Sequence, residues 1–165
     1  MDIKLLTAGA RCLVDANIFI YHLGMKAGEC TDFLDRVARQ EIEAHITTTI
    51  IAEVLHRQML IEAVTKGLVT PGKALNKLKD NPAIINSLTD YITEVEKLLR
   101  LPLNVVEVTA ADIARSHSLR QTHGLFVNDS INLACADRLG LTDIVTHDTD
   151  FQRVPHIASW EPTDV

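Results

Sequence analysis

The feature that most constrains the fold is an alternation of short apolar runs with longer segments of helical periodicity. Short runs rich in β-branched residues predict buried strands, and helical crossovers between them make neighbouring strands parallel. The segments predicted as strands are 11–16, 44–48, 103–108, 143–146 and 156–159. We therefore expect an α/β fold: a three-layer sandwich with a mostly parallel five-stranded sheet between helices.

The segments between these runs predict helices over 28–40, 49–66, 71–80, 82–100, 109–124 and 128–140. Thr109 is a predicted N-cap, with Asp112 three residues later and Gly124 as the stop. Asn128 and Gly140 are predicted to cap the last helix in the same way. The chain contains no repeat, low-complexity stretch or linker, so we expect a single domain over 1–165 with a helical segment at about 61–101.

Composition excludes several protein classes. The chain is 47% hydrophobic, which is enough for a core, and its three cysteines are widely spaced without a metal-ribbon pattern. No signal peptide or apolar stretch of membrane-spanning length is visible, so we expect a cytoplasmic protein with no membrane partner. The net charge of −6 is unusual for a protein that binds nucleic acid. A cluster of catalytic acids neutralised by metal would account for part of it.

Four acidic residues are predicted to lie near one edge of the sheet. Asp15 and Asp148 follow the first and fourth strands, and the carboxyl ends of parallel strands meet at one edge. Asp129 begins an apolar helix, and Glu53 lies one turn into the helix after the second strand. Each residue taken alone also fits an ordinary structural role, because Asp often caps helices and Glu53 can pair with Arg57 four residues later.

Taken together, the four acids indicate a metal site. Carboxylates brought close to one another repel, which raises their pKa values, and a divalent cation removes the conflict. All-oxygen ligands favour Mg²⁺ or Mn²⁺ over zinc. Such a site activates water and neutralises a phosphoryl oxygen, so phosphodiester hydrolysis is the chemistry that we expect.

Four stretches resemble, in order, the motifs of PIN-domain nucleases, a family that includes VapC-type ribonuclease toxins. These stretches are VDANIFIY at 14–21, TIIAEV at 49–54, NDSINLACA at 128–136 and IVTHDTDF at 144–151. The resemblance covers essentially the whole chain. It implies strand order 3-2-1-4-5, dependence on Mg²⁺ or Mn²⁺, and cleavage of single-stranded RNA. Many members are toxins of VapBC-type toxin–antitoxin pairs, and many form homodimers.

The resemblance also implies roles for individual residues. The predicted catalytic, metal-binding acids are Asp15, Glu53, Asp129 and Asp148, and the predicted supporting residues are Asn17, Thr146 and Asp150. The functional hypothesis is an endoribonuclease acting on single-stranded or structured RNA, as the toxin partner of an antitoxin protein and as a homodimer. The segment at 61–101 is long and helical, and the chain is larger than compact toxin members. A substrate clamp, a dimer arm and a partner surface are alternatives for this segment.

Other interpretations stay open at this point. Arg57, Lys66, Lys73 and Lys77 are candidate contacts to RNA phosphates, and a solvated charged surface is the alternative. A phosphatase with Asp15 as nucleophile usually has an acid two residues later, where this chain has Asn17. A PIN-like module without catalysis, acting in an RNA-processing or protein assembly, is the non-enzymatic alternative. Metal dependence and the effect of Asp15→Asn distinguish these hypotheses.

Overall fold

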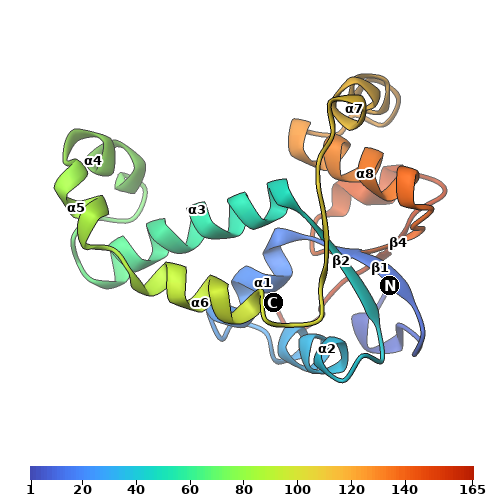
Figure 1. Ribbon diagram of the computed structural model, residues 1–165, viewed down its shortest axis with the longest axis horizontal. Helices are drawn as coiled ribbons and strands as arrows, with labels where there is room; N and C mark the ends of the chain where they lie inside the picture. Colours follow the sequence, from blue (N-terminus) through green and yellow to red (C-terminus); the bar gives the residue numbers. More distant parts are fainter.

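A five-stranded sheet lies at the centre of the computed structural model, which describes residues 1–165 (Figure 1). Its strands are β1 (Arg11–Val14), β2 (Glu43–Thr47), β3 (Asn104–Val106), β4 (Asp143–Val145) and β5 (Ala158–Trp160). The spatial order is β3-β2-β1-β4-β5, and every pairing between strands is parallel. The predicted α/β fold and strand order 3-2-1-4-5 are therefore confirmed.

Helices cover both faces of this sheet. On one side α1 (Ala16–Leu23) packs against α2 (Gly28–Ala38) and α3 (Thr48–Thr65), and α7 (Ala110–His123) packs on α8 (Val127–Leu139) on the other side (Figure 1). The central strands are buried from both faces, as Cys12, Val14 and Val145 show with no exposed surface. This is why the strands read as continuous apolar runs instead of alternating ones.

The ends of the last two long helices test the predicted caps. Thr109 and Asp112 form the expected reciprocal capping box of α7, and Gly124 and Gly140 both adopt left-handed conformations at the helix ends. The predicted N-cap Asn128 is wrong, because α8 begins at Val127 with Phe126 as its N-cap. Leu125 is buried just ahead of the helix. The packing of this side chain sets where α8 begins, ahead of the polar side chain of Asn128.

The segment predicted as one helix over 82–100 is two helices, and this prediction is wrong. α5 (Pro82–Ser87) and α6 (Asp90–Leu98) are separated at Leu88, which is extended and buried. The buried carboxylate of Glu62 on α3 accepts hydrogen bonds from the backbone N–H groups of Thr89 (3.1 Å) and Tyr91 (2.8 Å). An acceptor from another helix thus replaces the intrahelical bonds that a continuous helix would need.

An arm extends from the sheet along α3. Figure 1 shows α4 (Ala74–Asp80) and α5 beside the end of α3 that is remote from the sheet. A small apolar cluster that includes Ala63, Val69 and Leu78 holds this end together, apart from the main core around the sheet. No helix has the length and apolar character needed to cross a membrane. The assignment of one domain to the whole chain stays a prediction.

Candidate active site

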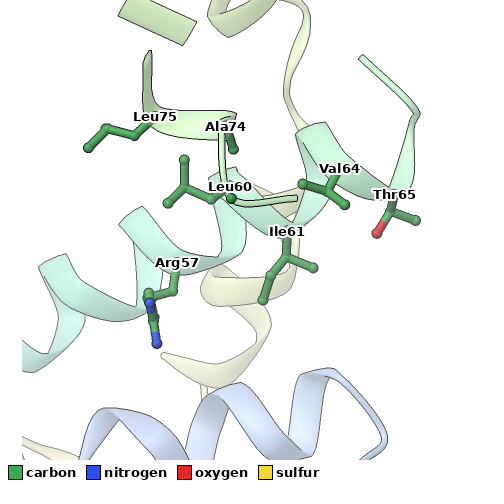
Figure 2. A pocket seen from close by; sticks show the side chains of 8 residues that line it. Arg57, Leu60, Ile61, Val64, Thr65, Ala74 and Leu75 are labelled. Atoms are coloured by element: carbon green, nitrogen blue, oxygen red, sulfur yellow. The ribbon is translucent and has the colours of Figure 1, made fainter. Parts of the chain in front are cut away.

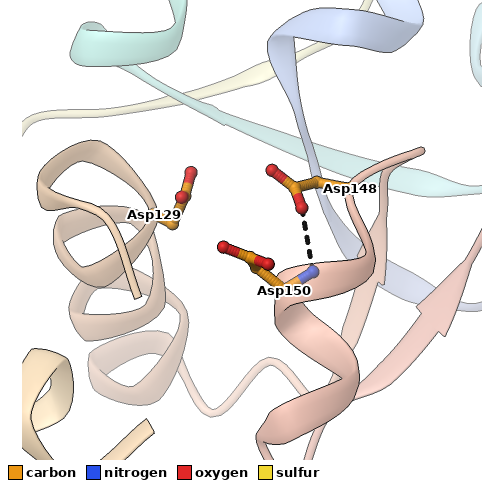
Figure 3. A group of neighbouring side chains, drawn as sticks. All are labelled: Asp129, Asp148 and Asp150. Carbon is orange, nitrogen blue, oxygen red and sulfur yellow. Dashed lines mark hydrogen bonds between the residues drawn. The ribbon is translucent and has the colours of Figure 1, made fainter. Parts of the chain in front are cut away.

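Acidic side chains from two parts of the chain meet beyond the carboxyl ends of the strands. Asp129 lies in the first turn of α8, and Asp148 and Asp150 lie at the start of η2 (Thr149–Arg153), just after β4. One carboxylate oxygen from each of these three residues lies within 4.8 Å of the other two. Figure 3 shows Asp129 pointing from α8 toward the other two side chains across a short gap. We call these three residues the acidic triplet.

Asp15 lies beside the acidic triplet in a fixed orientation. It caps α1, and its Oδ1 accepts a 2.7 Å hydrogen bond from the backbone N–H of Ala16. Its Oδ2 accepts from the amide of Asn17 and from the hydroxyl of Thr146, each at 2.7 Å. Asn17 and Thr146, predicted as supporting residues, thus both contact Asp15, and the three donors leave its carboxylate little rotational freedom.

The loop that carries Asp148 is held by the same network. The Thr146 hydroxyl accepts hydrogen bonds from the Asn17 amide (3.1 Å) and from the backbone N–H of Asp148 (2.9 Å). The Oδ1 of Asp148 in turn accepts from the backbone N–H of Asp150 at 2.8 Å (Figure 3). These bonds turn the chain so that Asp148 and Asp150 face the same space.

Glu53 reaches the site from α3. Its negative charge adds to the raised pKa values of Asp15 and Asp129, whereas its carboxylate is not among the three that lie within 4.8 Å of one another. It forms no ion pair with Arg57, which lines a pocket farther along α3. The alternative of an ordinary surface pair between Glu53 and Arg57 is therefore wrong.

The electrostatics of the site favour a bound cation. Burial raises the pKa of Asp15 to about 6, against the opposing effect of its hydrogen bonds, and the charges of Glu53 and Asp148 add to the rise. Burial also raises the pKa of Asp129 to about 6, and four neighbouring carboxylates, with Asp15 the largest contributor, raise it further. Asp129 accepts no hydrogen bond from the protein, so nothing offsets these effects on its ionised form.

One basic side chain touches the acidic triplet. Arg153 donates to Asp150 at 2.7 Å and to the backbone carbonyl of Gly124 at 2.9 Å. Asp15, Glu53, Asp129 and Asp148 have no basic partner. The donor set consists of carboxylate oxygens that converge on one space, and it fits a hard divalent cation such as Mg²⁺ or Mn²⁺.

The predicted RNA-contacting residues lie along the arm. Arg57 lines a pocket of about 390 Å³ with the apolar side chains of Leu60, Ile61, Val64 and Leu75 (Figure 2).

Lys66 forms ion pairs with Glu62 (2.6 Å) and Asp90 (3.0 Å). Lys73 and Lys77 line a separate pocket between α4 and α5. Because a helix rises ~1.5 Å per residue, Lys66 is about 20 Å from Glu53 along α3. Lys66 is thus remote from the acids of the site, and neither Lys73 nor Lys77 forms an ion pair with one of them.

Two features of the site were missed at the level of sequence. Asp150 was expected only as a supporting residue, whereas its carboxylate lies in the acidic triplet with Asp129 and Asp148. Arg153 is absent from the predicted site, although its spacing of three residues from Asp150 is one that brings side chains together within a helical turn.

Comparisons with known proteins agree with this geometry. A family model described as PIN domain matches residues 12–157. No curated protein matches the chain.

Three solved structures show the same fold. VapBC2 from Rickettsia felis, bound to a DNA fragment from its promoter, has a TM-score of 0.60 and 13% identity over 92% of this chain and 98% of that one. A toxin–antitoxin complex from Klebsiella pneumoniae has a TM-score of 0.52 and 20% identity, over 89% and 95%. FitAcB from Neisseria gonorrhoeae has a TM-score of 0.54 and 19% identity, over 93% and 99%. At these identities the likeness concerns the fold.

Proposed function

Because this chain belongs to the PIN domain family, we propose that it is a metal-dependent endoribonuclease that hydrolyses phosphodiester bonds of single-stranded or structured RNA. The observation that carries the proposal is the acidic triplet at the carboxyl edge of the sheet, on which the charges of Asp15 and Glu53 also act. Four of these five carboxylates have no basic partner. Folding alone does not require this arrangement, since mutual repulsion and burial both oppose it. A site that binds a divalent cation explains why these acids are together.

Mg²⁺ or Mn²⁺ is the cofactor in this proposal. Asp129, Asp148 and Asp150 would hold it, with Asp15 and Glu53 beside them. When bound, such an ion supplies Lewis-acid activation of water and neutralises charge on the scissile phosphate. It would also allow a chain with net charge −6 to accept a polyanion at an acidic surface.

Different residues of the chain orient the site and accept protons. Hydrogen bonds from Asn17 and Thr146 hold the Asp15 carboxylate in one orientation, so the role of Asp15 is to orient. Asp129 accepts no hydrogen bond from the protein, so its free lone pairs are available to a cation or to the proton of an attacking water. Arg153 holds Asp150 while its side chain stays about half exposed, and its guanidinium can meet a phosphate oxygen.

Two of the structural neighbours, VapBC2 and the toxin–antitoxin complex from Klebsiella pneumoniae, support a toxin role for this chain, with an antitoxin protein as partner. We place that partner on the pocket of α3 and α4 shown in Figure 2. Ile61 and Leu75 there are 40% and 45% exposed, and an apolar surface suits a protein better than RNA phosphates. Assembly as a homodimer and a cytoplasmic location belong to the same proposal.

The test is cleavage of a mixed single-stranded RNA pool in Mg²⁺, in Mn²⁺ and in EDTA. Wild type is expected to cut in either metal and not in EDTA. Asp15→Asn and Asp129→Asn are expected to lose cleavage, whereas Asp32→Asn, which removes an exposed carboxylate on α2, is expected to cut as wild type does. Metal-independent cutting, or full activity in the first two variants, would refute the proposed site.

The non-catalytic module predicts a different result in the same experiment. Such a module would leave the RNA intact under all conditions and would have no need to bind metal. Mn²⁺ titration of the wild type in the absence of RNA separates the two outcomes.

A further inference from the structure

A buried polar contact connects the two helices that carry Glu53 and Asp129. Asn132 on α8 is 2% exposed, and its Oδ1 accepts a hydrogen bond from the hydroxyl of Thr47 (2.8 Å) and another from that of Thr49 (3.1 Å). The two hydroxyls also lie 2.8 Å from each other. Its neighbours Ile131 and Leu133 on α8 are buried and apolar, and the buried hydroxyl of Ser130 bonds within its own helix. An amide at this position therefore needs a reason other than packing.

The contact lies one helical turn from each acid. Asn132 follows Asp129 by three residues on α8, and Thr49 precedes Glu53 by four residues on α3, so each pair shares a face of its helix. Thr47 ends β2 and caps α3 by accepting a hydrogen bond from the backbone N–H of Ile50 at 3.2 Å. A single side-chain oxygen on α8 thus holds the first turn of α3 and the strand that leads into it.

Directional bonds are suited to this position for a physical reason. Apolar packing is non-directional and allows two helices to slide or rotate by fractions of an ångström. The carboxylates of Glu53 and of the acidic triplet repel one another, which tends to separate the helices that carry them. Two hydrogen bonds to one buried oxygen oppose this motion, since an unpaired buried hydroxyl or amide costs about 1–3 kcal/mol.

We propose that Asn132 is a positioning residue that sets the separation of Glu53 from Asp129 through its bonds to Thr47 and Thr49, and so prepares the acidic site for a divalent cation. Asn132 itself binds neither metal nor substrate. This inference rests on the proposed function, because it assumes that the acids bind metal. Groups that orient metal-binding side chains typically change metal affinity 10- to 100-fold when they are lost.

The first test is Mn²⁺ binding by Asn132→Leu, measured without RNA by calorimetric titration. Leu has a similar volume, and the hydroxyls of Thr47 and Thr49, 2.8 Å apart, can still bond each other, so one donor is left unpaired. The metal-free melting temperature is therefore expected to fall by about 2–10 °C, and the variant is expected to stay folded at 25 °C. The affinity for Mn²⁺ is expected to fall about 10-fold or more. RNA cleavage by this variant is expected to recover as the Mn²⁺ concentration is raised, because the acids themselves are intact.

A second pair of variants avoids any folding defect at Asn132. Thr49→Val removes the hydroxyl at nearly constant shape and is expected to weaken Mn²⁺ binding, whereas Thr49→Ser keeps the hydroxyl and is expected to bind as wild type does. Ser130→Ala is the control for a buried hydroxyl on α8, because Ser130 bonds only to the carbonyl of Val127 in its own helix (2.8 Å). It is expected to leave Mn²⁺ affinity unchanged.

The outcomes separate this inference from the proposed function. Equal Mn²⁺ affinity in wild type, Asn132→Leu and Thr49→Val would overturn it, as would an equal loss in Ser130→Ala. A wild type that binds no Mn²⁺ would overturn it as well. A wild type that binds Mn²⁺ but cuts no RNA would refute the ribonuclease, and the affinities of the variants would still decide the role of Asn132.

Discussion

Replacing Asp129 by Asn is expected to make the metal-free protein more stable at neutral pH. The carboxyl group has a pKa of about 6 in the folded protein and 3.8 in its ordinary state. At pH 7.5 this difference corresponds to a cost on the order of 3 kcal/mol for keeping the group ionised in the fold. Partial solvation of the half-buried side chain and the loss of a favourable helix-dipole interaction reduce this gain in the variant. We therefore expect the free energy of unfolding to rise by about 1–2 kcal/mol.

The pH dependence has a definite sign. Since the folded pKa of Asp129 is raised, the folded state binds the proton more tightly than the unfolded state does, and this group makes wild type more stable as pH falls from about 7 to about 4. The amide in the Asp129→Asn variant does not titrate, so the advantage of the variant is expected at pH 7.5 and is expected to disappear near pH 4.5. Thermal unfolding in EDTA at both pH values measures it, with an expected gain of about 2–8 °C at pH 7.5.

Two comparisons make the reasoning refutable. Asp32→Asn removes an exposed carboxylate and is expected to change the melting temperature little. Asp15→Asn is expected to gain less than Asp129→Asn or to lose stability. The single oxygen of an amide can take the place of one carboxylate oxygen, accepting either from Ala16 or from Asn17 and Thr146. The NH₂ group then faces the donors that have lost their acceptor. A metal-free Asp129→Asn protein that is less stable than both wild type and Asp32→Asn at pH 7.5 would show that Asp129 is a structural contact.

Three further predictions concern metal binding and the scaffold. Saturating Mn²⁺ is expected to raise the melting temperature of wild type but not of Asp129→Asn, because a ligand stabilises only the state that binds it; equal shifts in both would contradict this. Glu62→Gln is expected to lower the free energy of unfolding by about 1–2 kcal/mol and to speed proteolysis near residues 88–89, since an amide cannot accept both N–H groups at the start of α6. An unchanged rate of proteolysis would contradict this. Asp112→Asn is expected to lower the free energy of unfolding by about 1–3 kcal/mol at pH 7, measured by denaturant unfolding. The reason is that the Arg138 guanidinium holds the pKa of Asp112 down to about 2. That contribution is complete above about pH 4 and is lost as pH falls toward 2, so a pH-independent difference would contradict it.

Much of the fold could be predicted because it depends on local patterns. The apolar runs that became β1 and β4 are buried from both faces, and their periodicity contrasts with that of the helices around them. The capping box of Thr109 and Asp112 was also visible, since both partners lie within one helical turn. Asp15 and Asp148 could be assigned to one edge because parallel strands share a direction.

Other features were decided by contacts between distant residues. Leu88 breaks the predicted helix at 82–100 because it packs into the arm, while the carboxylate of Glu62 supplies an alternative acceptor for the chain beyond it. The start of α8 was set by the burial of Leu125, against the local preference of Asn128. Neither contact leaves a sign in the neighbouring sequence.

The acidic site combines both kinds of information. The order of amino acids was enough to assign carboxylates to the ends of particular strands, because the direction of a parallel sheet fixes where its strands end. The folded chain was needed to show that Asp150 joins Asp129 and Asp148, and that Asn132 bonds to Thr47 and Thr49. These contacts depend on side-chain directions and on helix separations of a few ångströms. Only the packing of α3 and α8 around the shared sheet sets distances of that size.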